Sequence, residues 1–174
     1  MLRHVRIALI SAVAGTLSAA SVSTASYQYN AGLMCNPNSL VDPTWIADYD
    51  GLFHWGTSTG DAYCSISHPS SSFTPTAWQV RFWDRSGAEC VRCVFFYKTA
   101  TGGLSWGPWR FSSSTVGGTT SCSSPGYTGY NSLVSNLAFK PSPSNVAHAG
   151  FRCRVPAEGT GPTYSAIMGY RLTY

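Results

Sequence analysis

Charged side chains are scarce in this chain of 174 residues, where they make up 10% of the total; about 25% is usual. The net charge is +4, and the basic residues are scattered, with only Arg152 and Arg154 close together. Binding to nucleic acid through counterion release needs several Lys or Arg side chains on one face. The sequence therefore predicts no nucleic-acid partner.

The chain also lacks an apolar run of about 20 residues, the length that a membrane-spanning helix needs. Its main apolar stretch, residues 7–19, follows two arginines and precedes a row of small residues. This order is typical of an export signal. We expect a signal peptide over residues 1–25, cut after Ala25 or alternatively after Ala20; a buried N-terminal helix is the competing interpretation. Residues 26–174 then form a single domain without a transmembrane segment, secreted or held at the cell surface.

Motifs for the common cofactors and nucleophiles are missing. The sequence contains no P-loop, no G-x-G-x-x-G, no G-x-S-x-G and no haem motif. The histidines beyond the signal segment, His54, His68 and His148, lack the spacing of zinc ligands. We therefore predict no metal, no cofactor and no catalytic residue. A small hydrolase stays open only through His54, which is close in sequence to Asp48 and Asp50.

Cysteine is plentiful by contrast, and its number is even. An even number of cysteines in an exported chain predicts disulfides, although the pairing does not follow from the number alone. Cys90 and Cys93 form a C-x-x-C pattern at the start of an alternating apolar run. Residues three apart on a strand point to opposite faces, so we expect these two in different disulfides. The six cysteines are Cys35, Cys64, Cys90, Cys93, Cys122 and Cys153.

Short runs of alternating apolar and polar residues recur along the chain, and this pattern predicts strands. Trp78, Val80 and Phe82 share one face, and Phe151 and the following odd-numbered residues share another. In the last run, over residues 164–174, the even-numbered residues are expected on one face. Many short strands separated by turns predict an all-β fold, an antiparallel sandwich of the jelly-roll or immunoglobulin-like kind, with an irregular barrel as the alternative.

Three further expectations concern local structure. Residues 84–87 (D-R-S-G) predict a tight turn that joins two paired strands in a hairpin. Residues 47–55 predict one strand. The stretch 131–139 has apolar spacing that suits either a short helix or a strand, and the all-β context favours a strand.

Several short motifs follow one another in a fixed order: Ala31-Gly32-Leu33-Met34-Cys35, Tyr63-Cys64-x-Ile66, Phe82-Trp83-Asp84-Arg85-Ser86, Val91-x-Cys93, Phe151-x-Cys153-x-Val155-Pro156 and Ser165-x-Ile167-x-x-Tyr170-Arg171. In this order the chain resembles a group of small secreted proteins of myxobacteria and related soil bacteria. The resemblance implies export and a disulfide-stapled β fold, and it implies no catalytic residue. In that group four of these cysteines recur, and Cys90 and Cys122 look like additions. The resemblance therefore implies the pairs Cys35–Cys64, Cys93–Cys153 and Cys90–Cys122.

Aromatic residues carry the best functional signal, with six Trp and ten Tyr. Exposed aromatic rings stack on sugars or anchor interfaces, whereas buried rings fill a core. Trp83, Trp106 and Trp109 are the candidate ligand-binding residues. The leading interpretation is a non-enzymatic module of the envelope, matrix or cell surface. The alternatives are a carbohydrate-binding module that uses these tryptophans and a small secreted hydrolase. The expected partners are extracellular polysaccharides or surface proteins.

Overall fold

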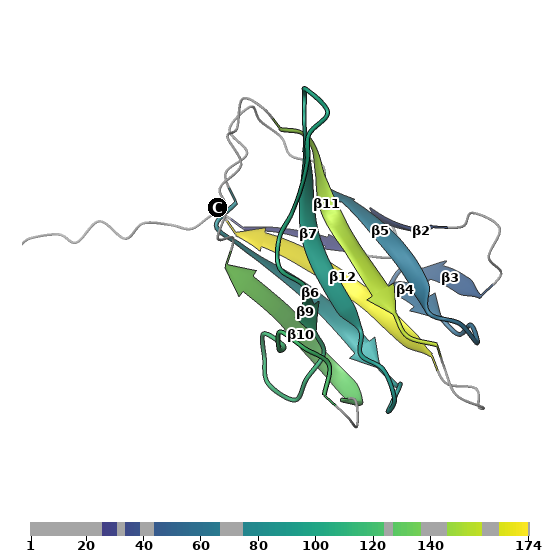
Figure 1. The fold of residues 1–174 in the computed structure, drawn as a ribbon. Coiled ribbons are helices and arrows are strands. Elements are labelled where there is room, and N and C mark those ends of the chain that lie inside the picture. Colours follow the sequence, from purple (N-terminus) through teal and green to yellow (C-terminus); the bar gives the residue numbers. More distant parts are fainter. Residues whose placement is uncertain are drawn as a thin grey trace, which may run out of the picture.

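The computed structural model of the chain describes residues 26–30, 34–38, 44–66, 75–123, 127–136, 146–157 and 164–173. The predicted signal peptide and His68 lie outside these residues. Strands dominate the described part, and Figure 1 shows them in two layers. The strands are β1 (Ser26–Asn30), β2 (Cys35–Pro37), β3 (Trp45–Asp48), β4 (Gly51–His54), β5 (Gly60–Ile66), β6 (Ala77–Asp84), β7 (Arg92–Thr99), β8 (Leu104–Trp106), β9 (Arg110–Phe111), β10 (Gly129–Asn136), β11 (Val146–Val155) and β12 (Ser165–Thr173).

The strands form two antiparallel sheets. Sheet A has the order β10-β6-β12-β4-β3, and β1 also pairs with β12. Sheet B has the order β2-β5-β11-β7-β8, and β9 also pairs with β7. This arrangement confirms the predicted β-sandwich. It also confirms the strand predicted within residues 131–139, as far as the described residues reach.

The core lies between the sheets and follows from the predicted alternation. Trp78, Val80 and Phe82 of β6 are almost fully buried, as is Phe151 of β11. The Trp78 and Phe151 rings meet edge to face, with centroids 5.4 Å apart. The hydroxyl of Tyr170 in sheet A donates a hydrogen bond to a backbone carbonyl of β5 in sheet B. The two layers are therefore joined by aromatic packing and by a polar contact through the core.

Three disulfides staple the sandwich. Two of them join register partners on neighbouring strands of sheet B, one between β2 and β5 and the other between β7 and β11. The third joins Cys90, in the turn before β7, to Cys122, in the segment after β9. Cross-links of this kind stabilise a fold mainly by restricting the unfolded chain. The bonds are Cys35–Cys64, Cys93–Cys153 and Cys90–Cys122, the same three pairs that the resemblance implies.

Strand β12 departs from the predicted alternation. Its pairing with β6 shifts register between Ile167 and Gly169, which marks a β-bulge. Ile167 faces the core before the bulge, and Tyr170 and Leu172 face the core after it. The prediction that one face runs unbroken from Tyr164 to Leu172 is therefore wrong, because the extra residue of the bulge exchanges the two faces of the strand.

The segment predicted as one strand over residues 47–55 belongs to two strands. Strands β3 and β4 pair with each other, with Ala47 opposite Leu52. The carboxylate of Asp48 accepts a hydrogen bond from the Tyr49 N–H at 2.6 Å, in the turn between them. Local bonds of this kind compete with strand pairing and favour turns. The prediction of a single strand is wrong, and the turn places Tyr49 and Asp50 at the end of a hairpin.

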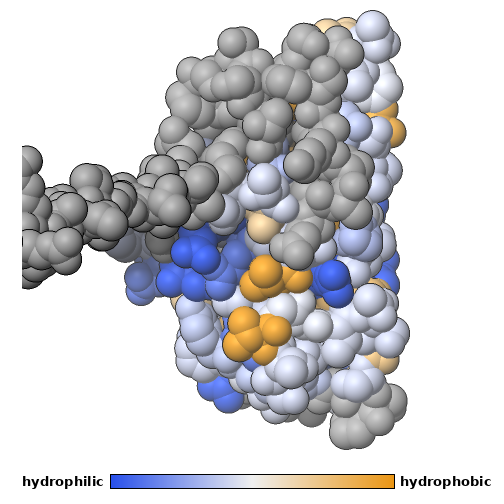
Figure 2. Space-filling model, turned by 90° about the vertical axis from the view of Figure 1, so that its left-hand side faces the viewer, coloured by the Kyte–Doolittle hydropathy of each residue, from blue (hydrophilic) through white to orange (hydrophobic). Residues whose placement is uncertain are grey.

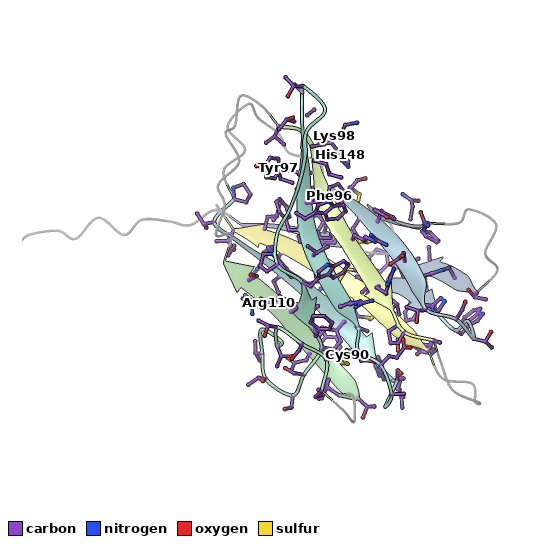
Figure 3. All side chains as sticks on the ribbon, viewed as in Figure 1. Cys90, Phe96, Tyr97, Lys98, Arg110 and His148 are labelled. Atoms are coloured by element: carbon purple, nitrogen blue, oxygen red, sulfur yellow. A yellow bond between two sulfur atoms is a disulfide. The ribbon has the colours of Figure 1, made fainter. Side chains whose placement is uncertain are left out.

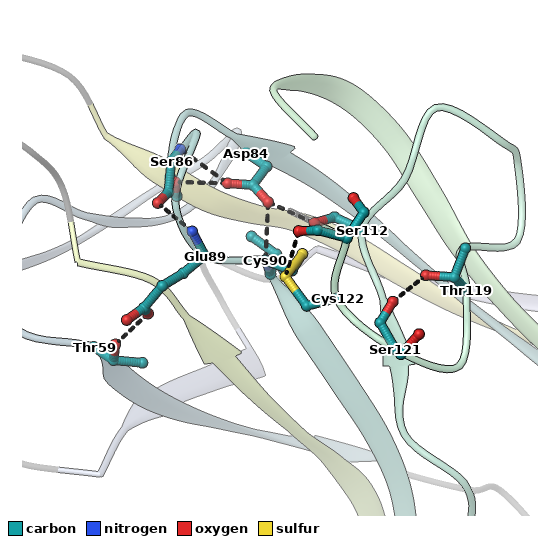
Figure 4. Close-up of a disulfide and its surroundings, with 12 residues drawn as sticks. Thr59, Asp84, Ser86, Glu89, Cys90, Ser112, Thr119, Ser121 and Cys122 are labelled. Carbon is teal, nitrogen blue, oxygen red and sulfur yellow. Dashed lines mark hydrogen bonds between the residues drawn. A yellow bond between two sulfur atoms is a disulfide. The ribbon is translucent and has the colours of Figure 1, made fainter. Parts of the chain in front are cut away.

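The chain passes from sheet A to sheet B at Asp84, the last residue of β6 (Figure 4). Its buried carboxylate accepts hydrogen bonds from the backbone N–H of Ser86 (3.0 Å) and of Val91 (2.9 Å). It also accepts from the hydroxyls of Ser112 (2.6 Å) and Ser165 (3.5 Å). Burial raises the pKa of Asp84 above its ordinary value of 3.8, although these hydrogen bonds offset part of the rise.

The hairpin predicted at residues 84–87 is therefore wrong, since β6 and β7 lie in different sheets. The turn itself is present, but the Asp84 carboxylate holds the N–H of a residue at the entrance of β7. This contact directs the chain across the sandwich. Turn chemistry alone does not distinguish a hairpin from such a crossing, because both need the same turn residues.

Removing the Asp84 carboxylate should destabilise the fold strongly. In Asp84→Ala two buried N–H groups lose their acceptor, and we expect the free energy of unfolding to fall by about 3 kcal/mol or more. In Asp84→Asn only one of the two carboxylate oxygens is replaced by a donor, so we expect a smaller loss of about 1–3 kcal/mol. Urea denaturation of the oxidised domain measures both. A loss in Asp84→Ala no larger than that in Asp84→Asn would contradict this view.

The same pair of proteins tests the pKa. Because the folded-state pKa of Asp84 is raised, its protonation stabilises the fold below pH 3.8, and this contribution is lost as the pH rises through the folded pKa. The wild type should therefore lose part of its advantage over Asp84→Asn between pH values of about 3 and about 7. A difference that grows with pH would show that the pKa is lowered instead.

Candidate functional site

The outer face of sheet A carries a groove. Alternation along β6 directs Trp78, Val80 and Phe82 inward, so Trp83 and Arg81 face outward and stay partly exposed. The bulge in β12 keeps Met168 on the same outer face. The groove has a volume of about 430 Å³, within the range of small-molecule sites. We call it groove A, and it is lined by Tyr49, Asp50, Phe53, Arg81, Trp83, Tyr130, Tyr164 and Met168.

Aromatic rings form a row across groove A. The Trp83 and Tyr164 ring centroids lie 6.0 Å apart, and those of Tyr164 and Phe53 lie 5.1 Å apart, both with edge-to-face geometry. Tyr130 is the register partner of Trp83 on β10 and is 53% exposed. Tyr49, in the β3–β4 turn, is 77% exposed. The row therefore runs across sheet A, from Tyr130 on β10 through Trp83 on β6 and Tyr164 before β12 to Phe53 on β4.

The Trp83 ring is held in place by contacts of the turn that follows it. The Arg85 guanidinium lies 5.0 Å from the centroid of the Trp83 ring, a cation–π contact. The backbone N–H of Arg85 donates a hydrogen bond to the Ser165 hydroxyl at 3.0 Å, which connects the turn after β6 to the start of β12. Ser165 in turn contacts Asp84. The ring at the centre of the groove is thus held by the same contacts that direct the chain into sheet B.

A smaller hollow of about 120 Å³ adjoins groove A. It is lined by Gln79, Arg81, Tyr170 and Arg171, so Arg81 lines both. The Tyr170 hydroxyl is buried, and its pKa is raised well above 10 by burial and by Tyr29. It therefore stays protonated and serves as a structural donor to β5. The aromatic row of groove A therefore has a separate basic hollow beside it.

On the outer face of sheet B, two neighbouring arginines pair with a carboxylate of the same sheet. Arg152 and Arg154 contact the Asp61 carboxylate at 2.9 and 3.0 Å. Burial alone would raise the pKa of Asp61, but the hydrogen bonds from Arg154 and Arg152 and their charges bring it below 3.8. The hydrogen bond between Arg154 and Asp61 raises the pKa of Arg154.

The structure places the three predicted tryptophans on two different faces. Trp83 lies in groove A on sheet A. Trp106 of β8 is 43% exposed on sheet B, with its ring centroid 5.1 Å from that of Phe96. Trp109 lies beside the same sheet, where the Arg92 guanidinium is 5.5 Å from its ring. The three therefore do not form one surface.

Two rings beside Trp106 belong to the same end of sheet B. Figure 3 shows Phe96 on β7 and His148 on β11, and their ring centroids lie 5.8 Å apart. His148 is exposed, and its ring contacts the Phe96 ring. Among the described residues, no group of three or more His, Cys, Asp or Glu side chains is placed to hold a metal ion.

A second pocket, of about 400 Å³, lies next to the Cys90–Cys122 disulfide. Arg92, Arg154 and Glu89 line it together with Thr59, whose hydroxyl donates to the Glu89 carboxylate at 2.7 Å (Figure 4). Burial and the nearby Arg154 lower the pKa of Arg92. Charges of both signs share this pocket, and an aromatic row like that of groove A is absent from its described lining.

The arrangement that a hydrolase would need is not assembled in the described residues. His54 is buried on the inner face of β4, where it packs against Trp45 with ring centroids 4.4 Å apart. Its Nδ1 lies 3.3 Å from the carbonyl oxygen of Pro156. Asp48 and Asp50 are exposed and lie at the turn of the β3–β4 hairpin. The fold separates His54 from both carboxylates, because His54 points inward.

Figure 2 shows the side of the molecule that is on the left in Figure 1. Hydrophilic and neutral side chains cover most of its described surface, and hydrophobic ones form small separate areas. The described part of this side thus lacks a broad apolar patch of the kind that marks a protein interface. In the described residues we also find no helix that is long and apolar enough to cross a bilayer.

Comparison with known proteins gives matches among solved structures only. No protein-family model matches the chain, and no curated protein matches it either. A xylan-binding module superposes with a TM-score of 0.52 over 87% of this chain and 97% of that module, at 12% identity. This likeness shows a shared β-sandwich fold.

Two further solved structures are more distant. A xylanase from Cellvibrio japonicus in complex with xylopentaose gives a TM-score of 0.43 at 12% identity, over 80% of this chain and 26% of that one. A family 11 carbohydrate-binding module from Clostridium thermocellum in complex with a mixed-linked tetrasaccharide gives a TM-score of 0.39 at 11% identity, over 94% of this chain and 92% of that one.

Sequence reasoning found Trp83 but missed the other aromatic residues of groove A. Phe53, Tyr130 and Tyr164 lie far apart in the sequence, and the order of the strands in sheet A brings them together. The turn residues Tyr49 and Asp50 could have been found as the end of a hairpin. The other neighbours of Trp83 carry no signal of their own, because pairing partners are not visible in a single sequence.

The paired charges of sheet B give a second stability test. We expect Asp61→Asn to lower the free energy of unfolding at neutral pH by about 1 kcal/mol, since two partly exposed ion pairs are lost. Because the folded-state pKa of Asp61 is lowered, its contribution is present above pH 3.8 and is lost as the pH falls through the folded pKa. Urea denaturation at neutral pH and near pH 2 measures this, and an equal difference at both would contradict it.

Proposed function

We propose that the domain is a carbohydrate-binding module that holds a polysaccharide chain in groove A. The observation that carries the proposal is the row of rings formed by Trp83, Tyr164 and Phe53, with Tyr130 and Tyr49 exposed at its two sides. Sugar rings present apolar C–H faces that pack on aromatic rings. Such a row suits several sugar units of one chain.

Polar groups beside the rings supply the second requirement of sugar binding. Asp50 and Arg81 line groove A together with three tyrosines, each of which carries a hydroxyl: Tyr49, Tyr130 and Tyr164. Binding sites generally combine a mostly apolar lining with a few polar groups that fix the orientation of the ligand. A carboxylate accepts from sugar hydroxyls and a guanidinium donates to sugar oxygens.

The likeness of the fold to a xylan-binding module supports this ligand class. The general role in an envelope, matrix or adhesion layer, which was the leading interpretation, is less specific and is compatible with polysaccharide binding. The small hydrolase has less support, because His54 points into the core, away from Asp48 and Asp50. The three disulfides support export to an oxidising compartment, as proposed for a secreted or surface protein.

Among the three candidate tryptophans, the proposal assigns ligand binding to Trp83. Trp106 packs on Phe96, Trp109 stacks with Arg92, and neither residue lines groove A. Trp83 also has partners, the Arg85 guanidinium and the Tyr164 ring, but Trp83 and Tyr164 both line groove A. Its neighbours therefore extend the binding surface.

Replacing Trp83 should remove polysaccharide binding and leave the fold intact. We expect Trp83→Ala to weaken binding more than tenfold, which corresponds to about 1.4 kcal/mol. Because Trp83 faces outward, the core contacts of β6 remain. The measurement is a pull-down on insoluble xylan, cellulose and cell-wall sacculi, followed by affinity electrophoresis with the soluble polymers that bind.

Trp106→Ala is the matched control, since it removes an exposed tryptophan from the opposite sheet. It should keep wild-type affinity, and circular dichroism should show that both variants fold. The proposal fails if the wild type binds none of these polymers, or if Trp83→Ala keeps wild-type binding.

A further inference from the structure

Two arginines stand together on the outer face of sheet A, beside groove A. Arg171 of β12 is the register partner of Gln79 on β6, and Gly169 of β12 is the partner of Arg81. Arg81 and Arg171 are therefore diagonal neighbours across one strand pair, and diagonal neighbours lie close enough for long side chains to meet. Both line the hollow of about 120 Å³, and Arg81 also lines groove A.

Neither guanidinium is neutralised by the described residues. Both ion pairs of the described residues belong to Arg152 and Arg154, which share Asp61 on the other sheet. Arg81 and Arg171 make no ion pair or side-chain hydrogen bond with a described residue. Two like charges placed side by side repel each other, and a bound anion would remove that repulsion. The two sheets thus treat neighbouring arginines in opposite ways.

The Arg81 guanidinium lies next to Gly169 of β12. A Cβ atom at position 169 would lie 3.4 Å from Nη2 of Arg81, which is an ordinary contact distance, and 2.8 Å from the carbonyl oxygen of Tyr29, which is the tighter contact. Because Arg81 lines both groove A and the hollow, it lies at the boundary between the aromatic row and the hollow.

We propose that Arg81 and Arg171 bind the carboxylate of an acidic sugar unit, so that the ligand is a uronate-containing polysaccharide. This proposal rests on the proposed function, because the aromatic row holds the chain whose carboxylate they meet. A guanidinium presents two parallel N–H groups that match a carboxylate, and such charge-assisted bonds are stronger than neutral ones. Gln79 supplies an amide that can bond to the hydroxyls next to the carboxylate.

The two parts of the site have separate roles. Groove A stacks the sugar rings through Trp83 and its neighbours, whether or not the chain is charged. The arginine pair adds affinity for chains that carry a carboxylate at the matching position. Asp50, on the groove lining, is a negative group in the same site, so the preference comes from the local pair and not from a broad basic surface.

The test compares glucuronoxylan with the same polymer after its carboxyl groups have been reduced to alcohols. The oxidised mature domain is titrated with each polymer at low salt. We expect the wild type to bind the acidic polymer about tenfold more tightly, and we expect this preference to shrink at high salt. Arg171→Gln, which lies outside groove A, should lose most of the preference and keep its affinity for the reduced polymer.

Lys98→Gln is the control for net charge, because it removes one exposed positive charge from sheet B. It should keep the full preference. Equal wild-type affinity for the two polymers, or an equal loss in Lys98→Gln and Arg171→Gln, would overturn the arginine-pair assignment alone. If the wild type bound neither polymer, or if Trp83→Ala bound both normally, the proposed function would fail and this assignment with it.

Discussion

The arrangement of the sandwich depends on one buried carboxylate. Asp84 ends β6 in sheet A and accepts the N–H of Val91 at the entrance of β7 in sheet B. It also accepts from Ser112, after β9, and from Ser165, at the start of β12. A charge removed from water is tolerated only where donors surround it. Each of these donors comes from a different part of the chain, so the carboxylate requires that all of them stand in their native places.

The candidate site is a consequence of this constraint. Trp83 precedes Asp84 on β6, and the inward direction of Asp84 sends Trp83 outward. Arg85 follows, stacks on the Trp83 ring and donates through its N–H to Ser165. The residue that joins the sheets thus also orients the central ring of groove A. A ring held in this way loses little conformational freedom when a ligand binds.

The two outer faces differ in how their charges are satisfied. On sheet B, Asp61 neutralises Arg152 and Arg154, and the Trp106 and Trp109 rings pack on neighbouring side chains. On sheet A, the rings lie along one groove, and Arg81 and Arg171 have no acidic partner among the described residues. Arginines that already share a carboxylate gain little from an anionic ligand, whereas arginines without an acidic partner gain a full charge-assisted bond.

The sequence by itself determined the fold class and the inward-facing residues of β6 and β11, because alternation with a period of two shows which residues of a strand face the core. It identified Trp83 as a candidate ligand-binding residue, and the resemblance of its motifs implied the disulfide pairs that the structure contains. The tertiary structure alone decided the crossing at Asp84, the bulge after Ile167 and the strand order that gathers Tyr130, Trp83, Tyr164 and Phe53. Alternation is a local property, whereas pairing partners and register depend on contacts between residues far apart in the chain.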